Sequence, residues 1–185
     1  MEDRNRRAAG FVLTLDELRA ITAFNVACAE LVIDVFEVAA PDDPRPRVAL
    51  DAAAAFAAGG PRTGTQRVTA LAAHRAAKEV ASAPAHAAMS AGDAAASGYL
   101  HPLADAAQVG HILRGPAHCV LARMQCTDAP SSEEAMAAVF GLVTATVVDV
   151  LRRYPRADVR GKDVSVVVSE LDSRLRAVDA QEGAG

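Results

Sequence analysis

Alanine is the feature that most limits what this chain can fold into. There are 43 alanines among 185 residues, and alanine is the strongest helix former because it has neither β-branching nor side-chain entropy to lose. GC-rich codons favour alanine and arginine alike, so the prediction also needs the helical spacing of the larger apolar residues. Together they predict an all-α fold with a single helical domain at 13–179, a flexible segment at 1–12 and a disordered tail at 180–185.

Charge and composition exclude several classes of protein. A net charge of -4 excludes an overall electrostatic footprint for nucleic acid. No uncharged stretch reaches the roughly 20 residues of a membrane span. The three cysteines, Cys28, Cys119 and Cys126, have no metal-ligand spacing. We therefore expect a cytoplasmic protein with no membrane partner, cofactor, metal or disulfide, and a homodimer stays open.

Helix starts and stops divide the chain into about seven predicted helices. Capping boxes at Thr14/Glu17 and Ser131/Glu134 open two of them. Gly115-Pro116 should kink or stop the fifth. The predicted helices are 15–39, 44 to about 59, 63–82, 84–99, 102–125, 132–151 and 164–178. We prefer a compact bundle of helical hairpins to a solenoid.

The predicted helix at 132–151 is apolar on nearly every face. A helix of that kind is buried on all sides in a globular protein. The sequence therefore predicts that it is the central helix, with Phe140 and Val147 in the core.

Two arginines lie at the start of the second predicted helix, in Asp43-Pro-Arg45-Pro-Arg47. Free N–H groups at a helix N-terminus favour negative charge. Arg45 and Arg47 are therefore candidate residues for binding an anion or a partner. In the structural alternative, Asp43 caps the helix while both arginines pair with neighbouring carboxylates.

The third predicted helix carries His74, Arg75 and Lys78. Residues 74 and 78 are one turn apart and share a face, so these two side chains can address one ligand together. The alternative is a solvated polar face.

The middle third of the chain supplies the best candidate for a small site. If the fifth helix is regular, His101, Asp105 and Gln108 lie on one face, with His111 about a quarter turn away. No nucleophile is evident, and His101 and Asp105 are only two metal ligands. The alternative is a buried hydrogen-bonded network that orients the helices. Other polar residues of this region are Asp93 and Tyr99.

Asp93 stands in a run of small residues. Alanine neighbours bring helices close together and leave a carboxylate little water, so Asp93 needs a polar partner. We expect Arg75 or Lys78 to be its counter-charge.

A basic connection follows the sixth predicted helix, from Arg152 to Lys162, and contains Tyr154. It can contact phosphate, or its arginines can offset the macrodipole at a helix C-terminus. Glycine-rich phosphate loops, a Gly-x-Ser-x-Gly elbow and a His-Glu-x-x-His helix are all missing from the sequence.

Between residue 11 and about 155 the chain resembles immunity proteins of bacterial polymorphic toxin systems. The resemblance rests on Asp43-x-Arg-Pro-Arg, Gln66-Arg-Val-x-Ala-Leu-x-Ala-His-Arg-Ala-Ala-Lys78, Ala91-Gly-Asp-Ala-Ala-Ala, Tyr99-Leu-His-Pro-Leu and Gln108-Val-Gly-His-Ile-Leu113. It implies an all-α fold and a toxin as partner. That family usually has Trp or Tyr near the position of Phe56, which keeps the bulk but not the polar group. An exonuclease-subunit label found on some relatives is not supported, because its ATPase and nuclease motifs are missing here.

Two classes of function follow. In the first, the protein binds and neutralises a cognate toxin through a surface. In the second, it is an enzyme or small-ligand-binding protein that uses His74, Asp93, His101 and Gln108. Burial distinguishes them, because a deep polar pocket at these residues favours the second class and a packed, internally paired network favours the first.

Overall fold

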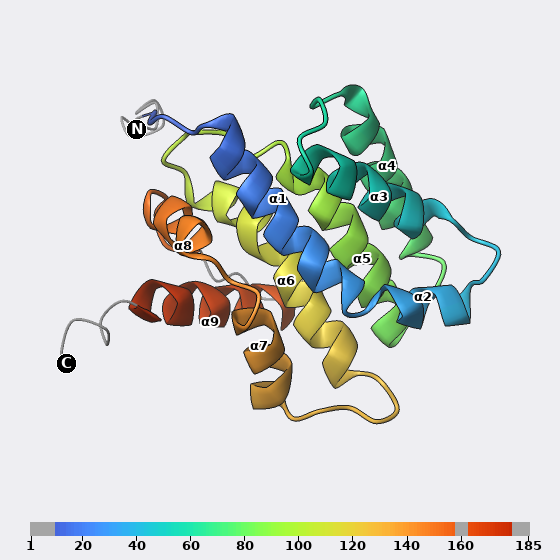
Figure 1. Cartoon of the computed structure of the whole chain (residues 1–185). Coiled ribbons are helices and arrows are strands. Elements are labelled where there is room, and N and C mark those ends of the chain that lie inside the picture. The colour runs from blue at the N-terminus through green and yellow to red at the C-terminus, as the bar shows by residue number, and fades with distance from the viewer. Residues whose placement is uncertain (1–9, 158–162, 179–185) are drawn as a thin grey trace, which may run out of the picture.

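The computed structural model describes residues 10–157 and 163–178. These residues form nine α-helices, one short 3-10 helix and no strand (Figure 1). The all-α prediction is confirmed, and the predicted number of about seven helices is too low. The helices are α1 (Leu15–Glu30), α2 (Ile33–Ala39), α3 (Arg45–Ala57), α4 (Gly64–Ala76), α5 (Ser82–Ser97), η1 (Ala106–Gln108), α6 (Val109–Met124), α7 (Ser132–Phe140), α8 (Ala145–Arg152) and α9 (Asp163–Ala177).

Both capping boxes read from the sequence are present, and a third opens α4. The Thr14 and Ser131 hydroxyls accept from the Glu17 and Glu134 N–H groups. At α4, the Gln66 side chain accepts from the Thr63 N–H at 2.9 Å. Because each cap satisfies N–H groups that lack a helical partner, these three helix starts are locally encoded.

The predicted helix at 15–39 is two helices. The chain breaks at Leu31 and Val32, where Val32 has φ -138° and ψ -3°. Val32, Ile33 and Phe36 are each at most 2% exposed. The break therefore lets α2 bury its apolar residues at an angle to α1, and burial outweighs the helical continuation that the spacing predicts.

The fifth predicted helix does not stop at Gly115-Pro116, since α6 runs through both residues. Pro116 has no N–H to offer the carbonyl of Ile112 one turn earlier. The side-chain amide of Asn25 on α1 donates to that oxygen instead, at 3.0 Å. Ser90 on α5 donates to the Gly115 carbonyl at 2.9 Å. Helix α1 thus supplies the hydrogen bond that the proline removes, and α5 adds a contact to the neighbouring carbonyl.

The first part of that predicted helix is also different, because residues 101–105 are not helical. Asp105 caps the short 3-10 helix by accepting from the Ala107 N–H at 2.9 Å. His101, Asp105 and Gln108 therefore do not share one helix face.

The predicted central helix at 132–151 is also wrong. It consists of α7 and α8, which are bent by 99° relative to each other. Val147 is buried, but Phe140 is only partly buried. No single helix among the described residues is both long and apolar enough to cross a membrane, and α7 and α8 reach that length only as a bent pair.

The centre of the molecule is formed by α5 and α6, which lie side by side (Figure 1). α5 packs against α1, α2, α3 and α4, and α6 packs against α1, α7 and α9. Much of α5 is alanine, and its buried members are Ala83, Ala87, Ala88, Ala91, Ala94 and Ala95. Small side chains allow helix axes to approach closely. The polar residues of α5 and α6 are therefore brought together inside a bundle.

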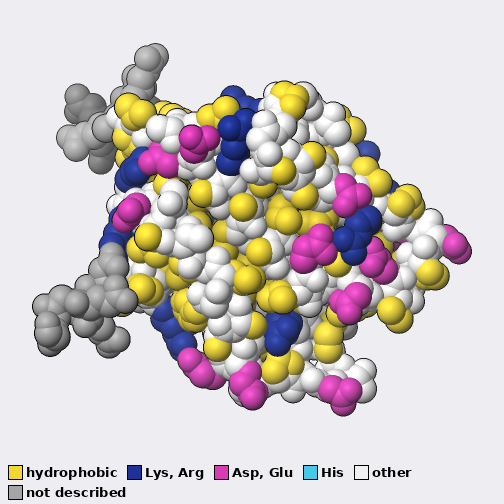
Figure 2. Space-filling model, viewed as in Figure 1, with side chains coloured by type: hydrophobic (Ala, Val, Ile, Leu, Met, Phe, Trp, Pro, Cys, Tyr) yellow, Lys and Arg dark blue, Asp and Glu magenta, His cyan; other side chains and the backbone are white. Residues whose placement is uncertain are grey.

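Hydrophobic side chains and uncharged atoms cover most of the face seen in Figure 2. In Figure 2, with α1 toward the viewer, acidic and basic side chains lie next to one another at the edges of the face, and no histidine is visible. Among the ion pairs of the described residues, Arg47 pairs with both Glu30 and Glu37.

Candidate functional site

A buried carboxylate on α5 is the centre of the candidate site. Asp93 is 2% exposed, and Arg114 on α6 donates to both of its oxygens. The shortest contact joins Arg114 Nη2 and Asp93 Oδ1 at 2.8 Å. The Arg114 side chain itself is 44% exposed. The expected counter-charge, Arg75 or Lys78, is therefore wrong, and the cation comes from a helix whose course the sequence did not predict.

Three imidazoles extend this ion pair. His74 Nε2 on α4 lies 3.2 Å from Asp93 Oδ1, although it has no aligned hydrogen-bond partner in the described residues. On the other side, His118 Nε2 lies 3.9 Å from Asp93 Oδ2. His118 Nδ1 in turn contacts His86 Nδ1 at 2.9 Å. Because one of two hydrogen-bonded ring nitrogens must be unprotonated, His86 and His118 cannot both carry a full positive charge in this arrangement.

A glycine makes room for His74. A Cβ at Gly92 on α5 would lie 2.4 Å from His74 Cδ2 and 2.6 Å from His74 Nε2. Such distances are well inside van der Waals contact, so the ring reaches the carboxylate only because residue 92 has no side chain.

Burial sets the ionisation of the group. It acts to raise the pKa of Asp93, but the nearby His74 ring and the Arg114 guanidinium hold that pKa below its usual value. Burial lowers the pKa of His118 to about 4, although the charge of Asp93 opposes this. Burial also lowers the pKa of His86 and of His111. At neutral pH the centre is an Asp93–Arg114 ion pair, with the neutral imidazoles of His118 and His86 on one side of it.

Three hollows surround the ion pair, and we name each after one lining residue. The Tyr99 hollow is about 340 Å³, the Lys78 hollow about 720 Å³ and the Ser165 hollow about 470 Å³. His74 lines the first two hollows, and Arg114 lines the last two. The two residues closest to Asp93 therefore connect the three hollows into one surface.

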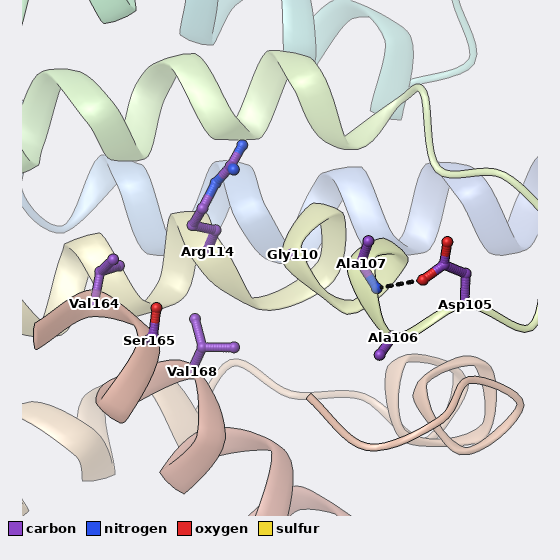
Figure 3. A pocket seen from close by; sticks show the side chains of 8 residues that line it. All are labelled: Asp105, Ala106, Ala107, Gly110, Arg114, Val164, Ser165 and Val168. Carbon is purple, nitrogen blue, oxygen red and sulfur yellow. Dashed lines mark hydrogen bonds between the residues drawn. The ribbon is translucent and has the colours of Figure 1, made fainter. Parts of the chain in front are cut away.

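The Ser165 hollow lies between α6 and α9 (Figure 3). Val164, Ser165 and Val168 come from α9, whereas Arg114 turns from α6 toward α5. The guanidinium thus leaves this hollow to reach Asp93, and its stem forms part of the wall.

The structure brings several of the predicted site residues together. His74, Tyr99, His101 and His111 line the Tyr99 hollow, and Lys78 lines the adjoining one. Tyr99 is held in place because its hydroxyl donates to the Thr63 carbonyl at 2.8 Å. His74 lies on α4 and Lys78 in the turn after it, Tyr99 and His101 lie in the loop after α5, and His111 lies on α6.

The remaining predicted site residues do not line the Tyr99 hollow. Three of them make hydrogen bonds or ion pairs within the chain, and Arg75 makes no ion pair in the described residues. Gln108 accepts from the His101 N–H at 2.9 Å and so closes the loop between them. Arg75 is exposed on α4 and has no ion-pair partner within 10–157 and 163–178. Arg45 pairs with Asp43 and Glu79, and Arg47 with Glu30 and Glu37. These are the carboxylate contacts that the structural alternative describes.

The described part of the basic connection makes structural contacts. Arg152 donates to the Arg176 carbonyl at 3.0 Å, and the Tyr154 hydroxyl donates to the His101 carbonyl at 2.9 Å. Arg153 pairs with Glu17 and donates to the Val12 carbonyl, which joins the end of α8 to the start of α1. Arg160 and Lys162 lie outside the described residues.

Sequence reasoning missed Arg114, His86 and His118. Arg114 and His118 are four residues apart on α6, a spacing that places both on one face of an unbroken helix. The prediction of a kink at Gly115-Pro116 concealed that relationship.

The contacts of Asp93 and Ser90 favour a structural role for these residues over a catalytic one. Asp93 is sealed by its neighbours, whereas a general base has to reach the proton that it removes. Ser90, the hydroxyl nearest in sequence, donates to the Gly115 carbonyl. Within the described part of the chain, no three His, Cys, Asp or Glu side chains are placed to hold a metal ion. The exposed elements are the hollows and the helix surface beside them.

Comparison with known proteins gives one family. The family model described as Imm-5 like putative immunity protein matches residues 12–104. The match spans α1–α5 and includes His74, Asp93, Tyr99 and His101, whereas Arg114 and His118 lie beyond it. No curated protein and no solved structure matches the chain.

Proposed function

The chain belongs to the Imm-5-like immunity protein family, and from this premise we propose that it binds a cognate bacterial toxin in the cytoplasm and neutralises it by surface contact. The observation that carries the proposal is the burial of Asp93. Its carboxylate is 2% exposed and bound by Arg114, so the most distinctive polar group of the fold is used to join helices. What remains available to a partner is the surface around it.

A second candidate is the binding of a small polar ligand in the Tyr99 hollow. It is favoured by His111, whose Nδ1 is buried without a hydrogen-bond partner among the described residues. Buried polar atoms ordinarily have partners. A ligand that fills this hollow would raise the melting temperature of the wild-type protein but not of a Tyr99→Ala, His101→Ala variant.

The first test uses the genes beside this one. Each neighbouring open reading frame is expressed in a bacterial host with and without this protein, and growth is followed. We expect one product to arrest growth, and co-expression to restore it. The proposal fails if no neighbouring product is toxic, or if growth stays arrested when this protein is present.

Stoichiometry separates binding from catalysis. The purified toxin is titrated with this protein while the residual toxin activity is measured. Neutralisation by binding ends at a fixed molar ratio, with a complex that elutes together on gel filtration. An enzyme that modified the toxin would inactivate it at far below one molecule per toxin molecule, and no stable complex would be needed.

A further inference from the structure

The outward face of α4, together with the turn that follows it, carries a group of positive charges. We use the name α4 face for Arg67, Val68, Leu71, Arg75 and Lys78, all of which are exposed. No Asp or Glu occurs between residues 60 and 78. The three cations of the α4 face have no ion pair in the described residues. In a chain of net charge -4, this face is a local region of positive potential.

The contrast with the other helices supports this view. On α3, Arg45 and Arg47 each pair with two carboxylates. On α9, Arg174 and Arg176 pair with carboxylates too. An arginine that is paired with a carboxylate of its own chain contributes little to the electrostatic potential outside the protein, because the two charges largely cancel. Those of the α4 face are free to attract a partner.

The α4 face is also shaped to receive side chains. Arg67, Leu71 and His74 follow one another on α4 at spacings of four and three residues, so they form one stripe about 10 Å long. Lys78 lies in the turn that follows the helix. The Tyr99 hollow takes in Arg67, Leu71 and His74, and the Lys78 hollow takes in His74 and Lys78. No carboxylate lines the Tyr99 hollow, and one, Asp163, lines the Lys78 hollow.

Apolar side chains stand among these charges. Val68 is 68% exposed and Leu71 is 51% exposed. A surface that binds nucleic acid typically has many cations placed along the phosphates. A surface that binds another protein typically combines an apolar centre with a polar, charged rim. The mixture on the α4 face fits a protein.

We propose that the α4 face is the docking surface for an acidic segment of the toxin. The inference rests on the proposed function and names the chemistry of its partner. Carboxylates of the toxin lie beside Arg67 at the Tyr99 hollow and beside Lys78 at the Lys78 hollow, and apolar toxin side chains contact Val68 and Leu71. Complementary charge of this kind speeds association and fixes orientation.

The closing experiment reverses the charges of the face. The double variant Arg67→Glu, Lys78→Glu is compared with wild type and with Arg156→Glu, an exposed arginine outside the α4 face. We expect the double variant to bind the toxin about 100-fold more weakly, because like charges then face one another. Arg156→Glu should bind like wild type. Raising sodium chloride from 50 to 300 mM should weaken binding by wild type and strengthen binding by the double variant, because salt screens attraction in the first and repulsion in the second.

Folding is controlled in the same samples. The reversed cations have no ion pairs to lose, so all three proteins should unfold at similar urea concentrations. If the double variant is folded and binds the toxin with wild-type affinity, or if Arg156→Glu weakens binding equally, the α4 face is not the docking surface.

A second arm does not depend on any toxin. Isotope-labelled protein is titrated with a hexaglutamate peptide and separately with a 12-base-pair DNA duplex, and amide resonances are recorded. The peptide should shift resonances of α4 in wild type and in Arg156→Glu but not in the double variant. No shift on α4, or tighter binding of DNA there, would overturn the inference. Peptide binding on α4 without any neutralised toxin would count against the proposed function alone.

Discussion

At the residue scale, the two partners of the central ion pair differ in their access to water. Asp93 is 2% exposed, whereas the Arg114 side chain is 44% exposed. Removing either residue breaks the same contact, but only one of the two changes leaves a charge that cannot reach solvent. The pair should therefore respond unequally to mutation.

Arg114→Ala should lower the free energy of unfolding by about 3–5 kcal/mol, because it leaves Asp93 charged and buried. Asp93→Ala should cost less, about 2 kcal/mol, since Arg114 can turn toward water. Urea unfolding followed by circular dichroism measures both values. Arg47→Ala, which breaks two exposed pairs, is the control and should cost at most about 1 kcal/mol. Equal losses for Arg114→Ala and Asp93→Ala would contradict the assigned exposures.

His118 should make stability depend on pH in a defined range. Its pKa is about 4 in the folded protein and 6.5 in the reference state, so between these values the unfolded chain binds a proton that the folded chain does not. Stability therefore falls as the pH decreases. From pH 7 to pH 5 the loss due to His118 should be about 2 kcal/mol.

The pH dependence is compared between wild type and His118→Gln. The variant should show a much smaller loss of unfolding free energy between pH 7 and pH 5, and it should also be less stable than wild type at pH 7. The lowered pKa values of His86 and His111 add to the slope in both proteins. Urea unfolding at the two pH values decides the matter, and a slope unchanged by His118→Gln would show that this imidazole is not the source.

At the element scale, α6 shows how a distant side chain completes a helix. Asn25 and Ile112 are 87 residues apart in the chain, and the amide of Asn25 bonds the carbonyl that Pro116 leaves free. Gly115 belongs to the same arrangement, since a Cβ there would lie 2.4 Å from Asn25 Oδ1. The hydrogen bonding of α6 at Pro116 therefore depends on Asn25 of α1, and the close approach of Asn25 depends on Gly115.

This unit predicts a coupling between two mutations. Asn25→Ala should destabilise the protein by about 1–3 kcal/mol or more, because it leaves the buried Ile112 carbonyl unbonded. In a Pro116→Ala background the helix supplies an N–H to that carbonyl, so the same mutation should cost about 1 kcal/mol less. A double-mutant cycle by urea unfolding measures the difference. Strict additivity of the two mutations would show that Asn25 does not compensate for the proline.

The same comparison explains which elements could be predicted from the sequence. The starts of α1, α4 and α7 were predictable because Thr14, Thr63 and Ser131 bond groups three residues away or fewer. The course of α6 was not, because it depends on Asn25 and Ser90 from other helices. The break between α7 and α8 was missed because an apolar run hides it, with Thr144 extended at φ -107° and ψ 159°.

At the scale of the whole molecule, the candidate site is a product of packing. The sequence offered His74, Tyr99, His101 and His111 as polar residues in an alanine-rich chain. That they line one hollow depends on the packing of α4 against α5 and of α5 against α6. The partner of Asp93 could not be predicted, because Arg114 follows from the unbroken α6. That arginine also lies beyond the part matched by the family model. The two halves of the chain are therefore joined at the residues nearest the site.

The location of the core gives a final prediction for the whole fold. Phe56 on α3 is fully buried, and a Cβ at Gly98 would already lie 3.5 Å from its ring. Phe140, which the sequence placed in the centre, packs only partly against the core at the end of α7. Phe56→Ala should therefore lower the free energy of unfolding by about 3–5 kcal/mol, because a cavity adds to the lost transfer energy. Phe140→Ala should cost about 1 kcal/mol, since its ring stays partly in water in the native protein. Urea titrations at pH 7 measure both losses. A larger loss for Phe140→Ala than for Phe56→Ala would contradict the placement of the core around α5 and α6 and would favour α7 and α8.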